Sequence, residues 1–171
     1  MLPEGADENE VSSEAVISAD ENLLKTFQVE LAAGRDFSKD FPSDEQQSFI
    51  VNETAVKAFG LGNPDDALGK NIVWDSEKKG KVIGVVKDFN FSSLHDQIKP
   101  LIIHILPDWY GFMVLRVQPD NLQQTLSDLQ AKWKSVSSSP FTYSFLNDDF
   151  AALYAAEQNM QRVLGLFTLL S

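Results

Sequence analysis

Short apolar runs recur along the chain, and the spacing within each run predicts its local structure. The run at 82–86 has β-branched side chains on both pleat faces, which is typical of a strand covered on both sides. The pattern at 71–74, followed by a charged tip and then the 82–86 run, predicts a hairpin. Further strands are predicted at 13–19, 29–33, 49–51, 101–106, 112–118 and, from alternating aromatic and polar residues, 141–145.

A second pattern, with apolar residues three to four positions apart, predicts helices. One such stripe predicts an amphipathic helix from Leu122, Leu126, Leu129 and Trp133. Asp20 and Asn52 are residue types that favour helix starts, and each precedes a shorter apolar stripe. Asp148 or Asp149 starts a predicted final helix that runs without a breaker to the last residue. Strands and helices interleave, so the sequence predicts an α+β, mixed α/β fold.

Composition narrows the classes of partner. The 171 residues include 25 acidic and 14 Lys or Arg side chains, which gives a net charge of −11 and argues against nucleic acid as a ligand. The same charge disfavours spontaneous binding to anionic membrane surfaces. The sequence contains no cysteine, which excludes disulfides and thiolate metal sites.

Candidate catalytic and metal-binding patterns are weak. His95 and His104 lie nine residues apart without an HExxH motif, and no serine sits in a G-x-S-x-G elbow. The spaced acids Asp36, Asp40 and Asp44 lack the glycine and final glutamate of an EF-hand loop. The sequence therefore predicts no catalytic residue, no metal and no cofactor.

The segment 81–100, KVIGVVKDFNFSSLHDQIKP, carries the most specific signal in the chain. Its Gly-Val-Val-x-Asp-Phe-x-Phe core, followed by Ser-Leu-His and a proline, resembles the periplasmic domains of MacB-like, FtsX-like ABC transporter permeases. Other matches in the same order are GRDF at 34–37, VNETAVKAFG at 51–60 and FxYxFLxDxF near the C-terminus. The resemblance assigns structural signature positions to Gly34, Arg35, Asn52, Gly69, Gly84, Asp88, Phe89, Phe91 and Pro100.

The resemblance implies a two-lobed, non-catalytic domain on the periplasmic face of the bacterial inner membrane. Residues 1–31 and 100–160 would form a βαβ-type, porter-like lobe, with 32–99 as an inserted mixed-sheet lobe. Residues 161–171 would start a truncated transmembrane helix, because their apolar run is too short to cross a bilayer.

The same resemblance implies partners. The parent transporter would be a homodimer with an ATPase domain or subunit in the cytoplasm and a possible envelope or outer-membrane partner. The excised domain would be a monomer. Exposed loop residues that could contact a partner are Leu94, His95, Trp109 and Tyr110.

Two rival functions use some of the same residues. A stand-alone solute- or lipid-binding module would need an apolar pocket lined by residues such as Phe89, Phe91 and Trp109. An enzyme would pair His95 with Asp88 or Asp96 in a concave site.

Overall fold

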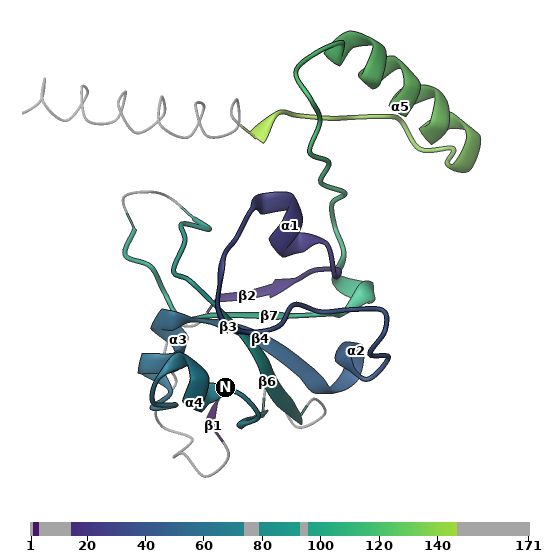
Figure 1. The fold of residues 1–171 in the computed structure, drawn as a ribbon. Coiled ribbons are helices and arrows are strands. Elements are labelled where there is room, and N and C mark those ends of the chain that lie inside the picture. The colour runs from purple at the N-terminus through teal and green to yellow at the C-terminus, as the bar shows by residue number, and fades with distance from the viewer. Residues whose placement is uncertain (1, 4–14, 74–78, 93–95, 147–171) are drawn as a thin grey trace, which may run out of the picture. The chain divides into compact units, whose positions relative to one another are not determined.

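The computed structural model describes residues 2–3, 15–73, 79–92 and 96–146 (Figure 1). The chain divides into two compact units, Met1–Arg116 and Val117–Ser171. Each unit is described by itself.

The first unit is built on one mixed sheet. Among the described residues the sheet has seven strands, ordered β1-β5-β6-β4-β7-β2, with β3 also paired to β6. Central β4 is parallel to β6 and antiparallel to β7, and β2 runs parallel to β7. The strands are β1 (Leu2–Pro3), β2 (Ala15–Ser18), β3 (Leu31–Gly34), β4 (Ser48–Asn52), β5 (Asn71–Val73), β6 (Lys79–Val86) and β7 (Leu101–His104).

Short helices connect these strands, and one longer helix belongs to the second unit (Figure 1). They are α1 (Leu23–Phe27), α2 (Asp44–Gln47), α3 (Glu53–Ala58), α4 (Pro64–Ala67), the 3₁₀ helix η1 (Pro107–Trp109) and α5 (Leu122–Val136). The predicted hairpin of β5 and β6 is confirmed, with Asn71 opposite Lys81.

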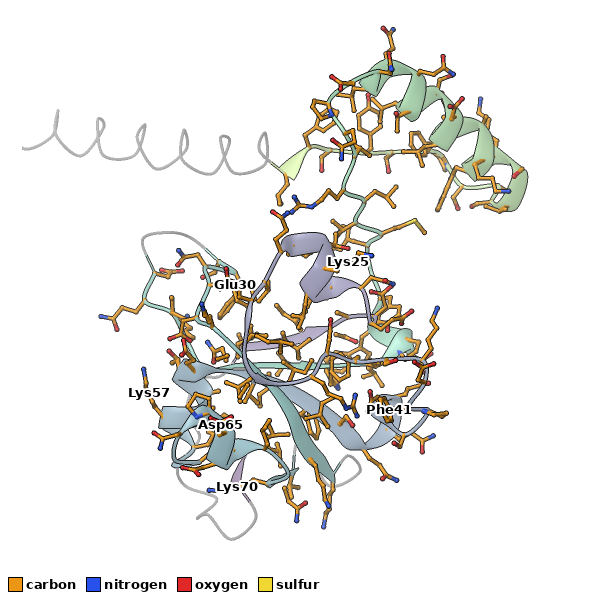
Figure 2. All side chains as sticks on the ribbon, viewed as in Figure 1. Lys25, Glu30, Phe41, Lys57, Asp65 and Lys70 are labelled. Carbon is orange, nitrogen blue, oxygen red and sulfur yellow. The ribbon has the colours of Figure 1, made fainter. Side chains whose placement is uncertain are left out.

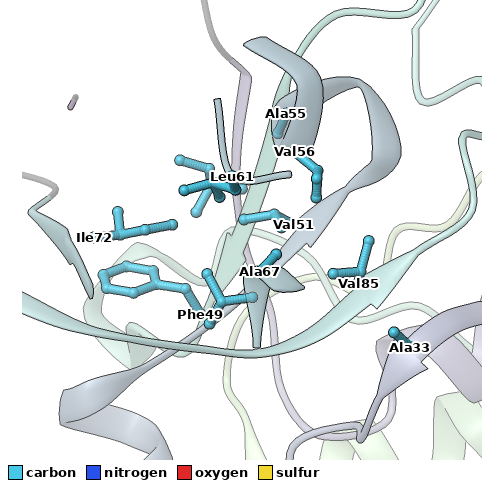
Figure 3. Close-up of a cluster of buried hydrophobic side chains, with 11 residues drawn as sticks. Ala33, Phe49, Val51, Ala55, Val56, Leu61, Ala67, Ile72 and Val85 are labelled. Atoms are coloured by element: carbon cyan, nitrogen blue, oxygen red, sulfur yellow. The ribbon is translucent and has the colours of Figure 1, made fainter. Parts of the chain in front are cut away.

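Buried apolar side chains form two clusters on the first unit. One includes Phe49 and Val51 of β4 and packs with α3 and α4 (Figure 3). The other includes Ile50 of the same strand and packs with α1. Because side chains alternate along a strand, this division shows that β4 is covered on both faces. The prediction for 82–86 is likewise confirmed, since Val82 and Val86 join different clusters.

The second unit confirms the predicted amphipathic helix as α5. Its apolar stripe is half-buried, and the ring of Trp133 lies 6.5 Å from that of Phe141. The indole nitrogen of Trp133 donates a hydrogen bond of 2.8 Å to the Ser139 carbonyl, which fixes the chain after the helix against it.

Two predicted strands are wrong. Residues 112–118 and 141–145 form no strand in the described chain. Phe112 and Met113 are 95% and 77% exposed. The physical reason is that alternation in a sequence predicts which side chains share a face, whereas a strand also needs a neighbour offering free N–H and C=O groups.

Other sequence-based expectations have different outcomes. Asp20 does not cap α1 directly, because its carboxylate accepts a hydrogen bond from the Asn22 amide ahead of the helix.

The boundaries expected between the two lobes stay a prediction. Strands 15–18 and 101–104 share one sheet with β4 and β6. The expected final helix and 161–171 lie outside the described residues. Within the described chain, the helices are too short or too polar to cross a bilayer.

Candidate functional site

The corner between β4 and α3 is organised by one buried amide side chain. Asn52 ends the strand with extended backbone and caps the helix, with its Oδ1 accepting a 2.8 Å hydrogen bond from the Ala55 amide. The same oxygen accepts from the Leu101 amide at 2.9 Å, and Nδ2 donates to the Lys99 carbonyl at 3.0 Å. Asn52 therefore joins the helix start to the first residue of β7, which is distant in sequence.

Asp88 serves the same helix start from the other side. Its carboxylate accepts hydrogen bonds from the Thr54 amide at 2.9 Å and from the Thr54 hydroxyl at 2.8 Å. In return, the Asp88 amide donates to the Glu53 carboxylate at 3.1 Å. The first amides of a helix have no partner within the helix, so these two side chains satisfy groups that would otherwise be exposed or unpaired. We call Asn52, Glu53, Thr54 and Asp88 the polar junction.

Further contacts hold the signature segment to the rest of the first unit, both after β6 and at Pro100. After β6 ends at Val86, Phe89 and Phe91 pack edge to face, 5.8 Å between ring centroids, against the core cluster on the α1 side. The Pro100 carbonyl accepts a 2.8 Å hydrogen bond from the Ala15 amide, beside the first residue pair of β2 and β7. The segment that bears the family resemblance thus has its described ends fixed by polar and aromatic contacts.

Two signature glycines allow strands β3 and β6 to approach closely. Gly34 and Gly84 are register partners. A Cβ on Gly34 would lie 2.3 Å from the Ile83 carbonyl oxygen, and one on Gly84 would lie 2.3 Å from the Arg35 carbonyl oxygen. Gly34 also has φ +77°, a conformation that other residues rarely adopt. Gly69 shares a positive φ of +78° but has open space around it.

Arg35 and Asp44 form a bidentate ion pair that the sequence did not predict. The two guanidinium nitrogens lie 2.6 and 2.8 Å from the carboxylate oxygens, and the Ser48 hydroxyl donates to Asp44 at 2.8 Å. The guanidinium also stacks over the Phe41 ring, with Cζ 4.1 Å from its centroid. This ion pair fixes the 36–43 loop to α2.

The groups around Asp44 lower the pKa of its carboxyl group. Burial acts to raise the pKa of Asp44, but hydrogen bonds from Arg35, Ser48 and the Ser38 amide outweigh it, and the net pKa is lowered. Asp36 shows the opposite balance, since burial raises its pKa more than the hydrogen bond from the Phe37 amide lowers it.

The candidate partner contacts divide into two pairs. Leu94 and His95 lie outside the described residues. Trp109 and Tyr110 are 60% and 42% exposed, and their role as partner contacts stays a prediction. The Trp109 ring meets that of buried His104 edge to face, with 6.3 Å between centroids.

The aromatics expected by the binding-module rival do not gather at one place, and His95, on which the enzyme rival depends, lies outside the described residues. Phe89 and Phe91 pack on the core cluster of the α1 side, whereas Trp109 contacts His104, which stacks on Phe49 in the other cluster. The structure therefore does not bring the three aromatics together around a pocket. Among the described residues, no group of three or more His, Asp or Glu side chains is placed to hold a metal ion.

Known structures define the class of this fold. The crystal structure of the periplasmic region of MacB from Actinobacillus actinomycetemcomitans is similar with a TM-score of 0.53 at 19% identity, covering 74% of this chain and 58% of that one. A domain of a putative permease protein from Porphyromonas gingivalis has a TM-score of 0.48 at 17% identity, covering 77% and 68%. No curated protein is similar to the chain in sequence.

The fold is mixed α/β and similar to that of the MacB periplasmic region, and the sequence identifies the family. The model of the MacB-like periplasmic core domain matches residues 3–160. The chain belongs to this family of ABC transporter permease domains. It spans 58% of the MacB periplasmic region to which it is similar.

Proposed function

We propose that this chain is a non-catalytic periplasmic domain that binds an envelope partner or cargo and relays ATP-driven motion from the membrane helices of its parent transporter. A structural role is supported by the hydrogen bonds that the polar signature residues form inside the protein. The side chains of Asn52 and Asp88 form hydrogen bonds within the protein, to Ala55, Leu101 and Thr54. A reacting carboxylate would instead face a substrate.

The proposal includes a specific setting. The parent permease is embedded in the inner membrane as a homodimer, and its ATPase domain or subunit lies in the cytoplasm. Residues 161–171 begin the membrane helix that leaves this domain. A continuous helix transmits rigid-body motion where a flexible segment does not.

Insertion of two glycines after Gln158 in the full-length permease tests the relay. We expect loss of transport while ATPase expression and the fold of this domain are retained, because glycine interrupts a helix. The measurements are export of the transported substrate and limited proteolysis of the domain. The matched control is the same insertion after Ser138, in the exposed bend that follows α5.

The two insertions have different expected outcomes. Transport should survive insertion after Ser138 and fail after Gln158. Wild-type export by the Gln158 insertion would overturn the relay, and partner binding by the domain would then have to be explained without motion.

A further inference from the structure

Three chain segments converge at one end of the sheet in the first unit. Because β2 and β7 are parallel, with Ser18 opposite His104, the residues that follow both strands emerge at the same end. The Ala19 amide donates to the His104 carbonyl at 3.0 Å, and the Ser18 hydroxyl donates to the Leu106 carbonyl at 2.8 Å. β4 runs antiparallel to β7, so α2, directly before β4, also lies at this end.

An aromatic pair projects from this end on a fixed turn. The Trp109 amide donates to the Leu106 carbonyl at 3.0 Å, and the Tyr110 amide donates to the Pro107 carbonyl at 3.1 Å. Behind the turn, Trp109 rests on the ring of His104, which is fully buried. The aromatic pair is therefore held by backbone and core contacts while large parts of both rings remain open to solvent.

Three carboxylates lie on the segments that meet at this end of the sheet. Asp20 and Glu21 follow β2, and Glu45 lies in the first turn of α2. Burial raises the pKa of Tyr110 first, and the negative charges of these three residues raise it further. Their field therefore reaches the phenol, and the surface has both aromatic faces and negative potential.

Lys39 of the chain itself shows that the negative potential at this surface attracts a cation. The Lys39 ammonium lies 2.7 Å from the Glu21 carboxylate, although the lysine side chain is 83% exposed. The hydrogen bond with Glu21 and the charges of Glu21 and Asp20 raise the pKa of Lys39. An exposed lysine from a partner would meet the same carboxylates, and an aromatic face beside them would add a cation–π contact.

We propose that Trp109, Tyr110, Asp20, Glu21 and Glu45 form a docking surface for an Arg- or Lys-rich segment of a partner polypeptide. One cation of the segment lies over an aromatic ring, and another replaces Lys39 at Glu21. The inference rests on the proposed partner-binding function and assigns the chemistry of the partner. Aromatic contact alone would accept either charge, whereas the carboxylates select basic segments and repel acidic ones.

Titration of the full 171-residue chain with a hexa-arginine peptide tests this surface, and hexa-glutamate serves as the opposite-charge control. Calorimetry gives the affinity, and the indole N–H signal of Trp109 in NMR spectra reports the location. We expect hexa-arginine to bind and shift the Trp109 signal, with affinity falling as salt screens the charges. Hexa-glutamate should not bind.

Variants separate the surface from general charge attraction. Trp109→Ala with Tyr110→Ala is expected to weaken hexa-arginine binding about 5-fold, the scale of a lost exposed cation–π contact with its neighbouring packing. Glu21→Gln with Glu45→Gln should weaken it by a similar factor. The matched control, Asp65→Asn with Asp96→Asn, removes two exposed charges from the first unit, one of them on α4 (Figure 2), and should retain most of the affinity.

Lys39→Ala gives the most specific test because it removes the ammonium bound to Glu21, while the 3.5 Å hydrogen bond from Asn22 Nδ2 to the same carboxylate stays. We expect tighter hexa-arginine binding by this variant, whereas a surface unrelated to Glu21 would show no gain. Trp109→Ala also removes a contact with His104, so Tyr110→Ala alone and the glutamine pair keep the test valid if that variant unfolds.

Three outcomes would overturn the inference: absence of hexa-arginine binding, no gain in affinity for Lys39→Ala, or equal weakening by the surface variants and the matched control. None of these outcomes bears on the Gln158 insertion, which measures transport in the full permease. Failure of the docking surface is therefore distinguishable from failure of the proposed relay.

Discussion

Asn52 connects the start of α3 to β7, and its position in the sequence does not predict the second of these contacts. Helix capping by this residue could be predicted, because asparagine before an apolar stripe is a common helix start. Its bonds to Leu101 and Lys99 could not, since no local pattern links residues nearly fifty positions apart. The cap and the link to β7 use the same buried side chain, so the local and long-range structures depend on each other.

Replacement of Asn52 by alanine is expected to lower the free energy of unfolding by about 2–4 kcal/mol, because it leaves the buried Leu101 amide and Lys99 carbonyl without their partner. Urea denaturation measures the change. Asn22→Ala is the matched control, since the exposed Asn22 side chain makes no cap bond to α1. Similar losses in the two variants would contradict the role assigned to Asn52.

The Asp44 ion pair predicts a pH dependence of stability. The folded pKa of Asp44 lies below its usual value of 3.8, so its contribution is complete above that value and is lost as pH falls through the folded pKa. Asp44→Asn should lower stability by about 2 kcal/mol at pH 7, the scale of hydrogen bonds to a charged group, and less at low pH.

Denaturation at pH 7 and at a pH below 3.8 measures this difference, with Asp40→Asn as the exposed control. A loss of equal size at both pH values would show that the charge of Asp44 is not what stabilises the fold. The pair escaped sequence analysis because Arg35 and Asp44 are nine residues apart across a loop.

Helices and strands that show their apolar pattern within their own residues were predicted correctly. α5 follows from its own stripe, and β6 from β-branched residues on both faces. The expected strands at 112–118 and 141–145 depend on neighbours, and alternation carried no information on which neighbour is present. α2 was missed because four residues are too few to show a helical period.

The β3–β6 pair predicts an order among glycine variants. Gly34→Ala and Gly84→Ala should each lower stability by about 3 kcal/mol or more, because the added carbon meets backbone oxygen that cannot move alone. Gly69→Ala should lower it by about 1 kcal/mol, from its positive φ without a clash. Thermal and urea unfolding would rank the three, and a Gly69 variant as unstable as the Gly34 variant would contradict the steric explanation.

At the scale of the whole molecule, the sequence predicted the family and the mixed α/β class. The match over residues 3–160 and the similar fold of a MacB periplasmic region agree with both. The division of the chain was harder to predict, because lobe boundaries depend on which strands pair across the sheet. The edge strand β2 pairs with β7, although most of the first unit separates these two strands in sequence.

The isolated chain is expected to be a monomer, because a net charge of −11 makes two copies repel each other. Sedimentation velocity at low salt and at about 0.15 M salt, where the Debye length is about 8 Å, measures this. A stable dimer under both conditions would show that self-association does not require the membrane helices. It would also place the exposed Phe112 and Met113 first among contacts to examine.

The position of β4 has a consequence for folding during export. All five residues of this strand are buried, yet its neighbours β6 and β7 occupy 79–86 and 101–104, later in the chain. A chain that enters the periplasm from its N-terminus therefore delivers Ser48–Asn52 well before either strand that will cover it. Pairing between distant segments is slow because a long loop must close first. Translocation thus leaves this fully buried strand uncovered until residue 104 has emerged, and that interval is when the nascent domain most needs protection from aggregation.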